Sequence, residues 1–242
     1  MAQSTAAVLR ELADANRILG HEGILDAFGH VSARNPATGD GAGAFLLSRA
    51  RAPELVEEAD ILEFTPQGEP VTPAAAPLYL ERYIHAAIYA ARPDVGAVCH
   101  SHTPAILPFS VSTTPLRSVI HTARFIGPAA PVWDLAREFP GEWSPLVRNY
   151  TYGASLAAAL GDGAIALLRG HGCVVVGRSP QEVVTRCTAM AKNAQVQETA
   201  HRLGEYTPLH PGECEDILDP GPPQAADNRA WEYYLRRAGL PR

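Results

Sequence analysis

The sequence lacks three features that would each point to a particular class of protein. No apolar run approaches the roughly 18 residues needed to cross a bilayer. Its 20 basic side chains form no cluster and are outnumbered by 26 acidic ones, which argues against nucleic-acid binding through a basic surface. Its four cysteines include no CxxC pair, and the N-terminal residues show no charged segment followed by an apolar one. We therefore expect a soluble, cytoplasmic protein with reduced thiols and with neither a membrane nor a nucleic-acid partner.

The remaining composition is that of an ordinary globular chain. Of its 242 residues, 46% are hydrophobic and 19% are charged, and such a chain can build one substantial core. We find no internal repeat and no clear linker, and predicted helices bracket a run of predicted strands. We expect an α/β fold with one main domain over 1–205. A proline-rich C-terminal arm over 206–242 is expected to pack on this domain or on a neighbouring subunit.

Apolar spacing and capping residues locate the expected elements. Stripes of helical period predict helices at about 5–19, 78–91, 152–160, 180–203 and 228–238, with Ser4 or Thr5 capping the first and Ser179 the fourth. Short apolar runs between turn residues predict strands at about 27–34, 44–48, 61–64, 95–102, 164–168 and 173–176.

The strand predicted at 95–102 ends in a His-x-His motif. Side chains alternate between the two faces of a strand, so His100 and His102 present their imidazoles on the same side. Two imidazoles on one rigid element suit two corners of a metal site. The alternative is a pair of core histidines that form local hydrogen bonds.

Two further residues extend this motif toward a metal centre. His171 lies between Gly170 and Gly172, at a tight turn between two predicted strands. Glu81 precedes His85 by four residues on a predicted helix, so both share one face. Three histidines and a carboxylate would leave metal positions open for substrate. The simpler interpretations are that His171 is a turn residue, that Glu81 is a solvated carboxylate and that His85 is a buried structural partner.

In order and spacing, these motifs resemble the class II aldolase/adducin family. The resemblance covers about residues 5 to 205 and includes Glu81-x-x-x-His85, Arg92-Pro93-Asp94, His100-x-His102 and Gly170-His171-Gly172. It implies a three-layer α/β/α sandwich with a largely antiparallel central sheet. It also implies that His100, His102 and His171 bind a metal and that Glu81 is the catalytic acid/base. The implied cofactor is one divalent ion per subunit, Zn²⁺ or Mn²⁺, with Fe²⁺, Co²⁺ or Mg²⁺ as options. The implied assembly is a homotetramer with sites near subunit interfaces.

Departures from the sugar-phosphate aldolases of this family change the expected substrate. Where those enzymes carry Ser-Ser before the glutamate, this chain has Tyr79-Leu80, and where they carry Gly-Asn it has Gly29-His30. Their small phosphate-holding loop is replaced by a segment with two guanidiniums, which suit a planar carboxylate. The predicted substrate-binding residues are His30, Ser48, Arg49, Arg51 and Tyr79. The alternative for both arginines is a solvated loop position.

His121 falls about where the family's aldolases carry a tyrosine that reaches into the neighbouring subunit's site. A histidine titrates near neutrality and can donate a proton, so we predict a catalytic role for His121 beside Glu81. The alternative is a surface histidine.

Segments 77–82, 99–103 and 169–173 resemble a decarboxylase branch of the family, whose members act on aromatic acids with a hydroxyl beside the carboxylate. Examples are the hydroxymethylpyridine-dicarboxylate and dihydroxyphthalate decarboxylases. We therefore predict a metal-dependent lyase of aromatic acid catabolism, which decarboxylates an ortho-hydroxy aromatic or heteroaromatic acid through a metal-stabilised enolate or phenolate. Three alternatives stay open: an aldolase or epimerase acting on a non-phosphorylated or acidic sugar, a non-haem iron oxygenase, and a non-catalytic scaffold like the adducin head.

Overall fold

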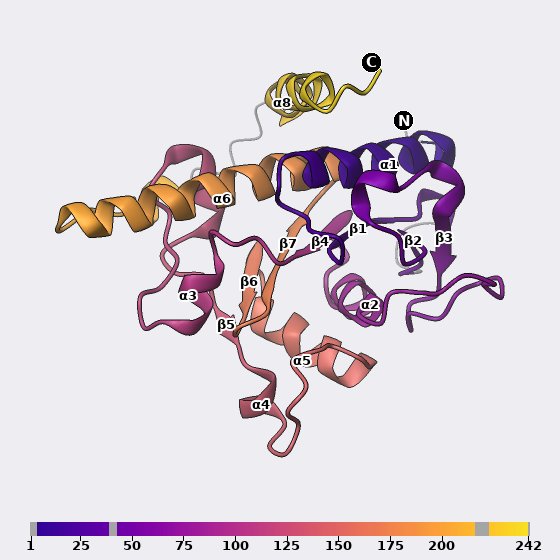
Figure 1. Cartoon of the computed structure of the whole chain (residues 1–242), viewed down its shortest axis with the longest axis horizontal. Coiled ribbons are helices and arrows are strands. Elements are labelled where there is room, and N and C mark those ends of the chain that lie inside the picture. Colours follow the sequence, from indigo (N-terminus) through magenta and orange to yellow (C-terminus); the bar gives the residue numbers. More distant parts are fainter. Residues whose placement is uncertain (1–3, 39–42, 216–222, 242) are drawn as a thin grey trace.

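A seven-stranded sheet forms the centre of the protein in the computed structural model, which describes residues 4–38, 43–215 and 223–241. Its strands are β1 (His30–Arg34), β2 (Phe45–Ser48), β3 (Ile61–Phe64), β4 (Ala97–Ser101), β5 (Val132–Trp133), β6 (Ile165–Leu168) and β7 (Gly172–Gly177). Their order is β3-β2-β1-β4-β7-β6-β5 (Figure 1). Neighbouring strands run antiparallel except β5 and β6, which pair in parallel. The sheet is thus mixed and mostly antiparallel.

Helices cover both faces of this sheet (Figure 1). On one face lie α1 (Thr5–His21) and α6 (Pro180–Leu203), which share a hydrophobic core with residues such as Cys99 of β4. On the other lie α2 (Arg82–Ala91) and α5 (Tyr150–Leu160), whose core includes the adjacent residue of the same strand, Val98. The alternation of strand side chains therefore divides the interior into two cores. This arrangement matches the expected α/β/α sandwich.

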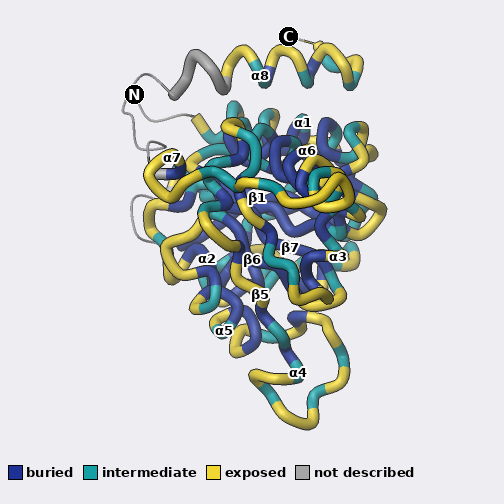
Figure 2. The backbone as a smooth tube through the Cα atoms, turned by 90° about the vertical axis from the view of Figure 1, so that its left-hand side faces the viewer, coloured by how far each residue is buried: buried dark blue, intermediate teal, exposed yellow. Residues whose placement is uncertain are grey.

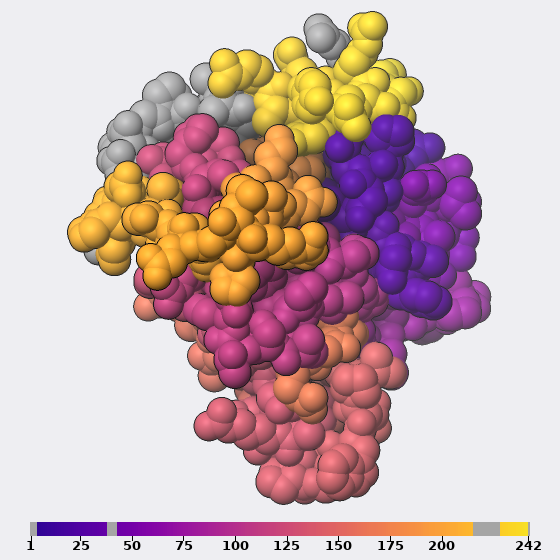
Figure 3. Space-filling model, turned by 60° about the vertical axis from the view of Figure 1, so that its left-hand side comes forward, coloured from indigo at the N-terminus to yellow at the C-terminus, as the bar shows by residue number. Residues whose placement is uncertain are grey.

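Shorter elements connect these layers. They are η1 (Pro36–Thr38), η2 (Pro53–Leu55), η3 (Glu58–Asp60), α3 (Leu107–Val111), η4 (His121–Ile126), α4 (Leu135–Glu138) and α7 (Pro211–Glu215). The segment of α4 and the chain after it forms one end of the molecule, and much of that chain is exposed (Figures 2 and 3).

The C-terminal helix α8 (Pro223–Arg237) lies at the opposite end, outside α1 and α6 (Figures 1 and 2). Its Trp231 and Leu235 are buried in the core that these two helices share with the sheet. Helix α8 thus packs against α1 and α6 of the same chain, and the arm over 206–242 stays a prediction. The proposed boundary at residue 205 stays a prediction. Among the described residues, we find no helical segment whose length and hydropathy would let it span a bilayer.

Local capping chemistry explains the beginnings of the two long helices. The Ser4 side chain accepts a hydrogen bond from the Ala7 amide, and Ser179 accepts one from the Glu182 amide. Ser179 was the predicted cap of its helix and Ser4 was one of two candidates for the other, and both helices are confirmed.

Three of the boundaries that differ from the predictions lie beside the site described below. Helix α2 begins at Arg82, because Glu81 has a non-helical backbone and lies at its N-cap rather than on its face. Strand β1 begins at His30, since Asp26 folds the preceding residues into a turn by accepting from the amides of Phe28 and Gly29. Strand β4 ends at Ser101, so His102 follows the strand directly.

Candidate metal centre

Four side chains from separate parts of the chain converge at one end of the sheet. Ligand atoms of Glu81, His100, His102 and His171 all lie within 4.8 Å of one another. The carboxylate comes from the N-terminus of α2, two imidazoles come from the end of β4, and the third comes from the turn between β6 and β7. These are the three predicted metal ligands and the predicted acid/base residue.

The turn that carries His171 requires glycine on both sides. Gly170 has a φ of +64°, a conformation that side chains disfavour. A Cβ at Gly172 would lie 2.2 Å from the carbonyl oxygen of Ser101, so only glycine lets the turn approach β4 this closely. The approach brings the Nε2 atoms of His102 and His171 within 3.2 Å of each other.

Hydrogen bonds fix the tautomer of all three imidazoles. The Nδ1 atom of His100 lies 3.1 Å from the carbonyl oxygen of Cys173, and that of His171 lies 3.2 Å from the carbonyl oxygen of Pro145. The Nδ1 atom of His102 lies 3.1 Å from both carboxylate oxygens of Asp26. Since these oxygens only accept, each Nδ1 donates and each neutral ring keeps a lone pair on Nε2.

The three Nε2 lone pairs face a carboxylate oxygen and one another. Glu81 Oε2 lies 3.3 Å from His100 Nε2 and 3.5 Å from His171 Nε2. His100 Nε2 is fully buried and has no hydrogen-bond partner among the described residues. Electron-rich atoms that meet without a hydrogen between them repel unless a cation joins them. The donor set therefore fits a divalent metal ion.

The low pKa of Glu81 requires positive charge beside the carboxylate, and a bound cation would supply that charge. Burial by itself would raise the pKa of Glu81, but the neighbouring His100 and His171 outweigh it and hold the pKa well below its usual range. Burial, followed by His100, lowers the pKa of His102 despite the carboxylate of Asp26. The carboxylate is thus anionic and the imidazole neutral, which are the forms that bind metals.

The groups that orient these side chains were missed by the sequence-based reasoning. Apart from Asp26, they act through the backbone: the carbonyls of Pro145 and Cys173 orient imidazoles, and the Val147 amide donates to Glu81 Oε1 over 2.9 Å. Any residue type offers a carbonyl, so sequence carries no signal for these contacts. Only Asp26, two residues before Phe28-Gly29, had a side chain that could have drawn attention.

The contact between Asp26 and His102 Nδ1 can be tested by mutation. Replacing Asp26 by asparagine removes the negative charge that favours an Nδ1–H on His102, and we expect metal affinity to fall about 10- to 100-fold. Competition with a fluorescent chelator measures this change. The exposed Asp162→Asn variant serves as the control and should match the wild type. Unchanged affinity in Asp26→Asn would show that His102 does not need this partner.

A cavity of about 440 Å³ opens directly beside the cluster. Its lining residues are Phe28, His30, Tyr79, Leu80, Glu81, His102, Leu146, Gly170 and His171. Two of the predicted substrate-binding residues, His30 and Tyr79, thus line this cavity, and their ring centroids lie 4.3 Å apart. Ser48 is buried next to the Tyr79 hydroxyl and does not line the cavity.

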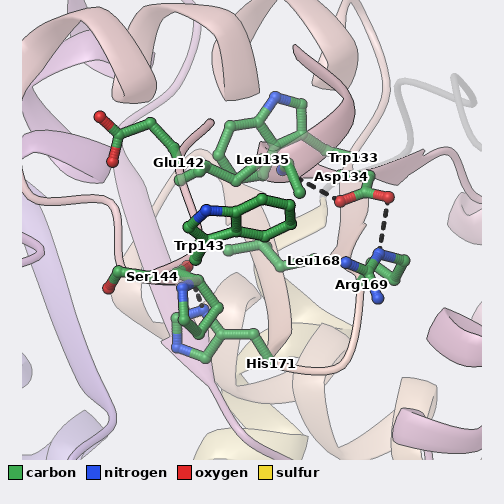
Figure 4. Close-up of a pocket in the computed structure, with 11 residues that line it drawn as sticks. Trp133, Asp134, Leu135, Glu142, Trp143, Ser144, Leu168, Arg169 and His171 are labelled. Atoms are coloured by element: carbon green, nitrogen blue, oxygen red, sulfur yellow. Dashed lines mark hydrogen bonds and ion pairs between the residues drawn. The ribbon is translucent and has the colours of Figure 1, made fainter. Parts of the chain in front are cut away.

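A smaller hollow of about 40 Å³ lies on the other side of His171. Figure 4 shows the indole of Trp143 in this hollow, beside the ion pair of Asp134 and Arg169. The N–O distance of that pair is 2.6 Å, and Trp143 is 86% exposed. This loop therefore places an aromatic surface next to a predicted metal ligand.

The structure does not bring Arg49 and Arg51 into the cavity. Asp60 holds both: its Oδ1 lies 2.7 Å from Arg49 Nε and its Oδ2 lies 2.5 Å from Arg51 Nη1. The predicted carboxylate for these guanidiniums is thus supplied within the chain. Binding a substrate carboxylate as predicted would require them to leave Asp60.

The ion pairs of Asp60 with Arg49 and Arg51, called the Asp60 cluster below, should stabilise the folded protein. We expect Asp60→Asn to lower the free energy of unfolding by about 2 to 3 kcal/mol, because two guanidiniums lose their charged partner while solvent partly screens them. Urea unfolding at pH 7 measures this loss, with Asp162→Asn as the control. An unchanged unfolding midpoint would contradict a stabilising role.

The same cluster predicts a pH dependence. Burial would raise the pKa of Asp60, but the Glu57 amide and the two arginines outweigh burial and lower it. A lowered pKa contributes stability above the unfolded value, about 3.9, and this contribution is lost as pH falls through the folded-state value. The difference between wild type and Asp60→Asn should therefore shrink in acid.

His121 does not join the cluster of the same chain. It is exposed at the start of η4 and lines a separate surface hollow with Arg124, Leu209, His210, Gly212 and Glu213. A role for His121 in catalysis would need a second copy of the chain, as its prediction assumed.

Fold and site together define an α/β protein with a candidate centre of three histidines and one glutamate beside a cavity. The profile of the Class II Aldolase and Adducin N-terminal domain matches residues 10–198. The chain belongs to the class II aldolase/adducin family.

Individual proteins agree with this assignment. The chain is 35% identical to "Decarboxylase tropJ" of Talaromyces stipitatus over 198 residues, covering 77% of this chain and 73% of that protein. It is 28% identical to a 3,4-dihydroxyphthalate decarboxylase of Arthrobacter keyseri, covering 74% and 73%. The crystal structure of an aldolase II superfamily protein from Pseudomonas syringae superposes with a TM-score of 0.79, at 22% identity and over 98% and 94% of the two chains. This last likeness concerns the fold alone.

Proposed function

We propose that this protein is a metal-dependent lyase that decarboxylates an ortho-hydroxy aromatic or heteroaromatic carboxylic acid. The observation that carries the proposal is the convergence of three Nε2 lone pairs and one carboxylate at the wall of a cavity. The family and its decarboxylase relatives support a lyase and favour CO2 as the product. A volume of about 440 Å³ lies in the range of small-molecule sites, and the walls include Phe28 and Tyr79.

His100, His102 and His171 would hold the metal ion, which we propose to be Zn²⁺ or Mn²⁺; imidazole ligands favour Zn²⁺, and oxygen ligands favour Mn²⁺. Bound there, the ion would supply Lewis acidity toward an oxygen on which negative charge develops. The ortho arrangement matters because a hydroxyl and an adjacent carboxylate can share one ion. A small-molecule carboxylate is thus the partner that the site favours.

Glu81 is the residue we assign to proton transfer. Its Oε1 is held by the Val147 amide, so the side chain stays in one orientation with Oε2 toward the histidines. When the bond to CO2 breaks, its electron pair stays on the ring carbon, which must then take up a proton. We propose that Glu81 accepts the proton of the substrate hydroxyl and delivers a proton to that carbon.

His121 takes part in this proposal only through a neighbouring chain. We propose a homotetramer in which His121 approaches the cavity of another subunit and donates a proton there. Light scattering after size-exclusion chromatography tests the assembly, and mixing His121→Ala with Glu81→Gln subunits tests the shared site. Activity recovered in mixed oligomers supports the proposal, and a monomer with full activity contradicts it.

A substrate screen tests the reaction. We expect the metal-loaded protein to release CO2 from at least one ortho-hydroxy aromatic acid and not from its meta-hydroxy isomer, in which the two oxygens are too far apart to share one ion. Chelator-treated protein is the control and should be inactive. Aldehyde release from an acidic sugar without CO2 release would favour the aldolase alternative. A requirement for O2 would favour an oxygenase, and full CO2 release without metal would remove the metal's role.

A further inference from the structure

A line of buried side chains leads from the interior to the cavity. The Tyr89 hydroxyl lies 2.8 Å from Ser32 Oγ, which lies 2.6 Å from His85 Nδ1. His85 Nε2 in turn lies 2.7 Å from Nδ1 of His30. All four residues are at most 1% exposed, and His30 is the one that lines the cavity. No metal ligand belongs to this line.

The direction of these hydrogen bonds follows from Tyr89, the residue at the inner end of the line. Burial raises the pKa of Tyr89 well above its usual value, so the phenol keeps its hydrogen. The Val98 amide at the same oxygen is a donor, which leaves Ser32 Oγ as the acceptor among the described residues. Ser32 must then donate to His85 Nδ1, and His85 must donate from Nε2 to His30 Nδ1.

The opposite direction is disfavoured. If His30 donated to His85, the Ser32 hydroxyl would donate to Tyr89 and the buried phenol hydrogen would have no acceptor, which is costly. With this direction established, His85 accepts at Nδ1 and donates at Nε2, and the Nδ1 atom of His30 accepts and therefore carries no hydrogen. The hydrogen of His30 therefore sits on Nε2.

The Nε2 atom of His30 is not sealed inside the protein. Among the described residues, the fully buried side-chain nitrogen and oxygen atoms without a partner are Ser48 Oγ and His100 Nε2. His30 Nε2 is neither of these, and the protein hydrogen bond of this ring is made at Nδ1. Its free edge therefore faces the cavity that it lines.

We propose that His30 is a specificity-determining hydrogen-bond donor, locked as the Nε2–H tautomer by Tyr89, Ser32 and His85, which binds a carboxylate oxygen of the substrate. The proposal rests on the proposed function, because it takes the ligand to be a carboxylic acid. A ring of this tautomer has no lone pair toward the cavity, so His30 is a donor here and not a general base. An anionic oxygen is the acceptor that such a donor binds most strongly.

The decisive comparison is between Ser32→Thr and Ser32→Val. The two side chains have the same shape and both suit a strand, but only threonine keeps the hydroxyl that donates to His85. We expect ¹⁵N-histidine NMR of the zinc-loaded, substrate-free protein to show His30 as the Nε2–H tautomer in the wild type and in Ser32→Thr. In Ser32→Val the Nδ1–H tautomer should become populated. A wild-type His30 that carries its hydrogen on Nδ1 would overturn the proposal.

Binding provides the second measurement, with salicylate as the probe carboxylate. We expect its Kd to rise about 10- to 100-fold in His30→Met, and by a smaller factor in Ser32→Val, when measured by calorimetry on the zinc-loaded protein. His30→Gln, which keeps an N–H near the position of Nε2, and Ser32→Thr should stay near the wild type. Loss in KM rather than in kcat is expected for any acid that the protein decarboxylates.

The outcomes separate this proposal from the proposed function. Equal salicylate affinity in Ser32→Val and Ser32→Thr, or no salicylate binding to the wild type, would overturn the donor role. If no acid in the screen loses CO2 while the tautomer and the binding pattern are as expected, the decarboxylase proposal fails and the donor role of His30 is supported.

Discussion

Replacing His102 by alanine should reduce bound metal from about one ion per chain to a small fraction of that, and catalysis should fall by at least about 10³-fold. One of three imidazole donors is removed, and His100, His171 and Glu81 are left with an incomplete site. His102 is the best choice for this test because it follows the end of β4 and is partly exposed, so its truncation leaves no closed cavity in the core. Elemental analysis of the purified variant measures the metal.

The control is His201→Ala, which removes an exposed imidazole from α6. This variant should keep both metal and activity. Circular dichroism and unfolding of His102→Ala establish that the fold is retained. A folded His102→Ala protein with a full complement of metal would contradict the ligand role.

Changing Glu81 to glutamine should separate proton transfer from metal binding. Glutamine keeps the shape and can still accept from the Val147 amide, but it has no charge and cannot carry the transferred proton. We expect activity to fall by about 10² to 10⁴, the range observed for loss of a general acid/base, while metal content stays near one ion per chain.

Single-turnover CO2 release and elemental analysis on the same sample measure both quantities. The exposed Glu205→Gln variant controls for a generic loss of charge and should match the wild type. Activity within a few-fold of wild type in Glu81→Gln would exclude it as the proton carrier. Loss of metal together with activity would make Glu81 a necessary ligand instead.

Much of the fold could be predicted from local chemistry. Ser4 and Ser179 cap helices with their own side chains, and helical apolar patterns and short apolar runs between turn residues predict helices and strands that the structure confirms. The order of the strands could not be predicted in this way. β4 lies between β1 and β7 because of packing across the whole chain, and no local pattern specifies that neighbourhood.

The candidate site also has a part that the sequence predicted and a part that only the structure revealed. The sequence alone determined which imidazoles and which carboxylate to examine, because the His-x-His motif and the glycine-flanked His171 have residue types suited to metal binding. Only the tertiary structure decided which hydrogen bonds orient them. Asp26 reaches His102 across 76 residues of chain, and Asp60 takes up the two arginines predicted for substrate.

The ligands could be predicted and the contacts that orient them could not, because the two are made by different kinds of chemical group. Metal ligands are special side chains, so their identity and spacing are visible in sequence. The Val147 amide and the Pro145 carbonyl are groups that every neighbouring residue also offers, and their value depends on position alone. Single hydrogen bonds in the line from Tyr89 to His30 join residues up to 57 apart in the sequence. The direction of these hydrogen bonds follows from burial, which only the folded chain has.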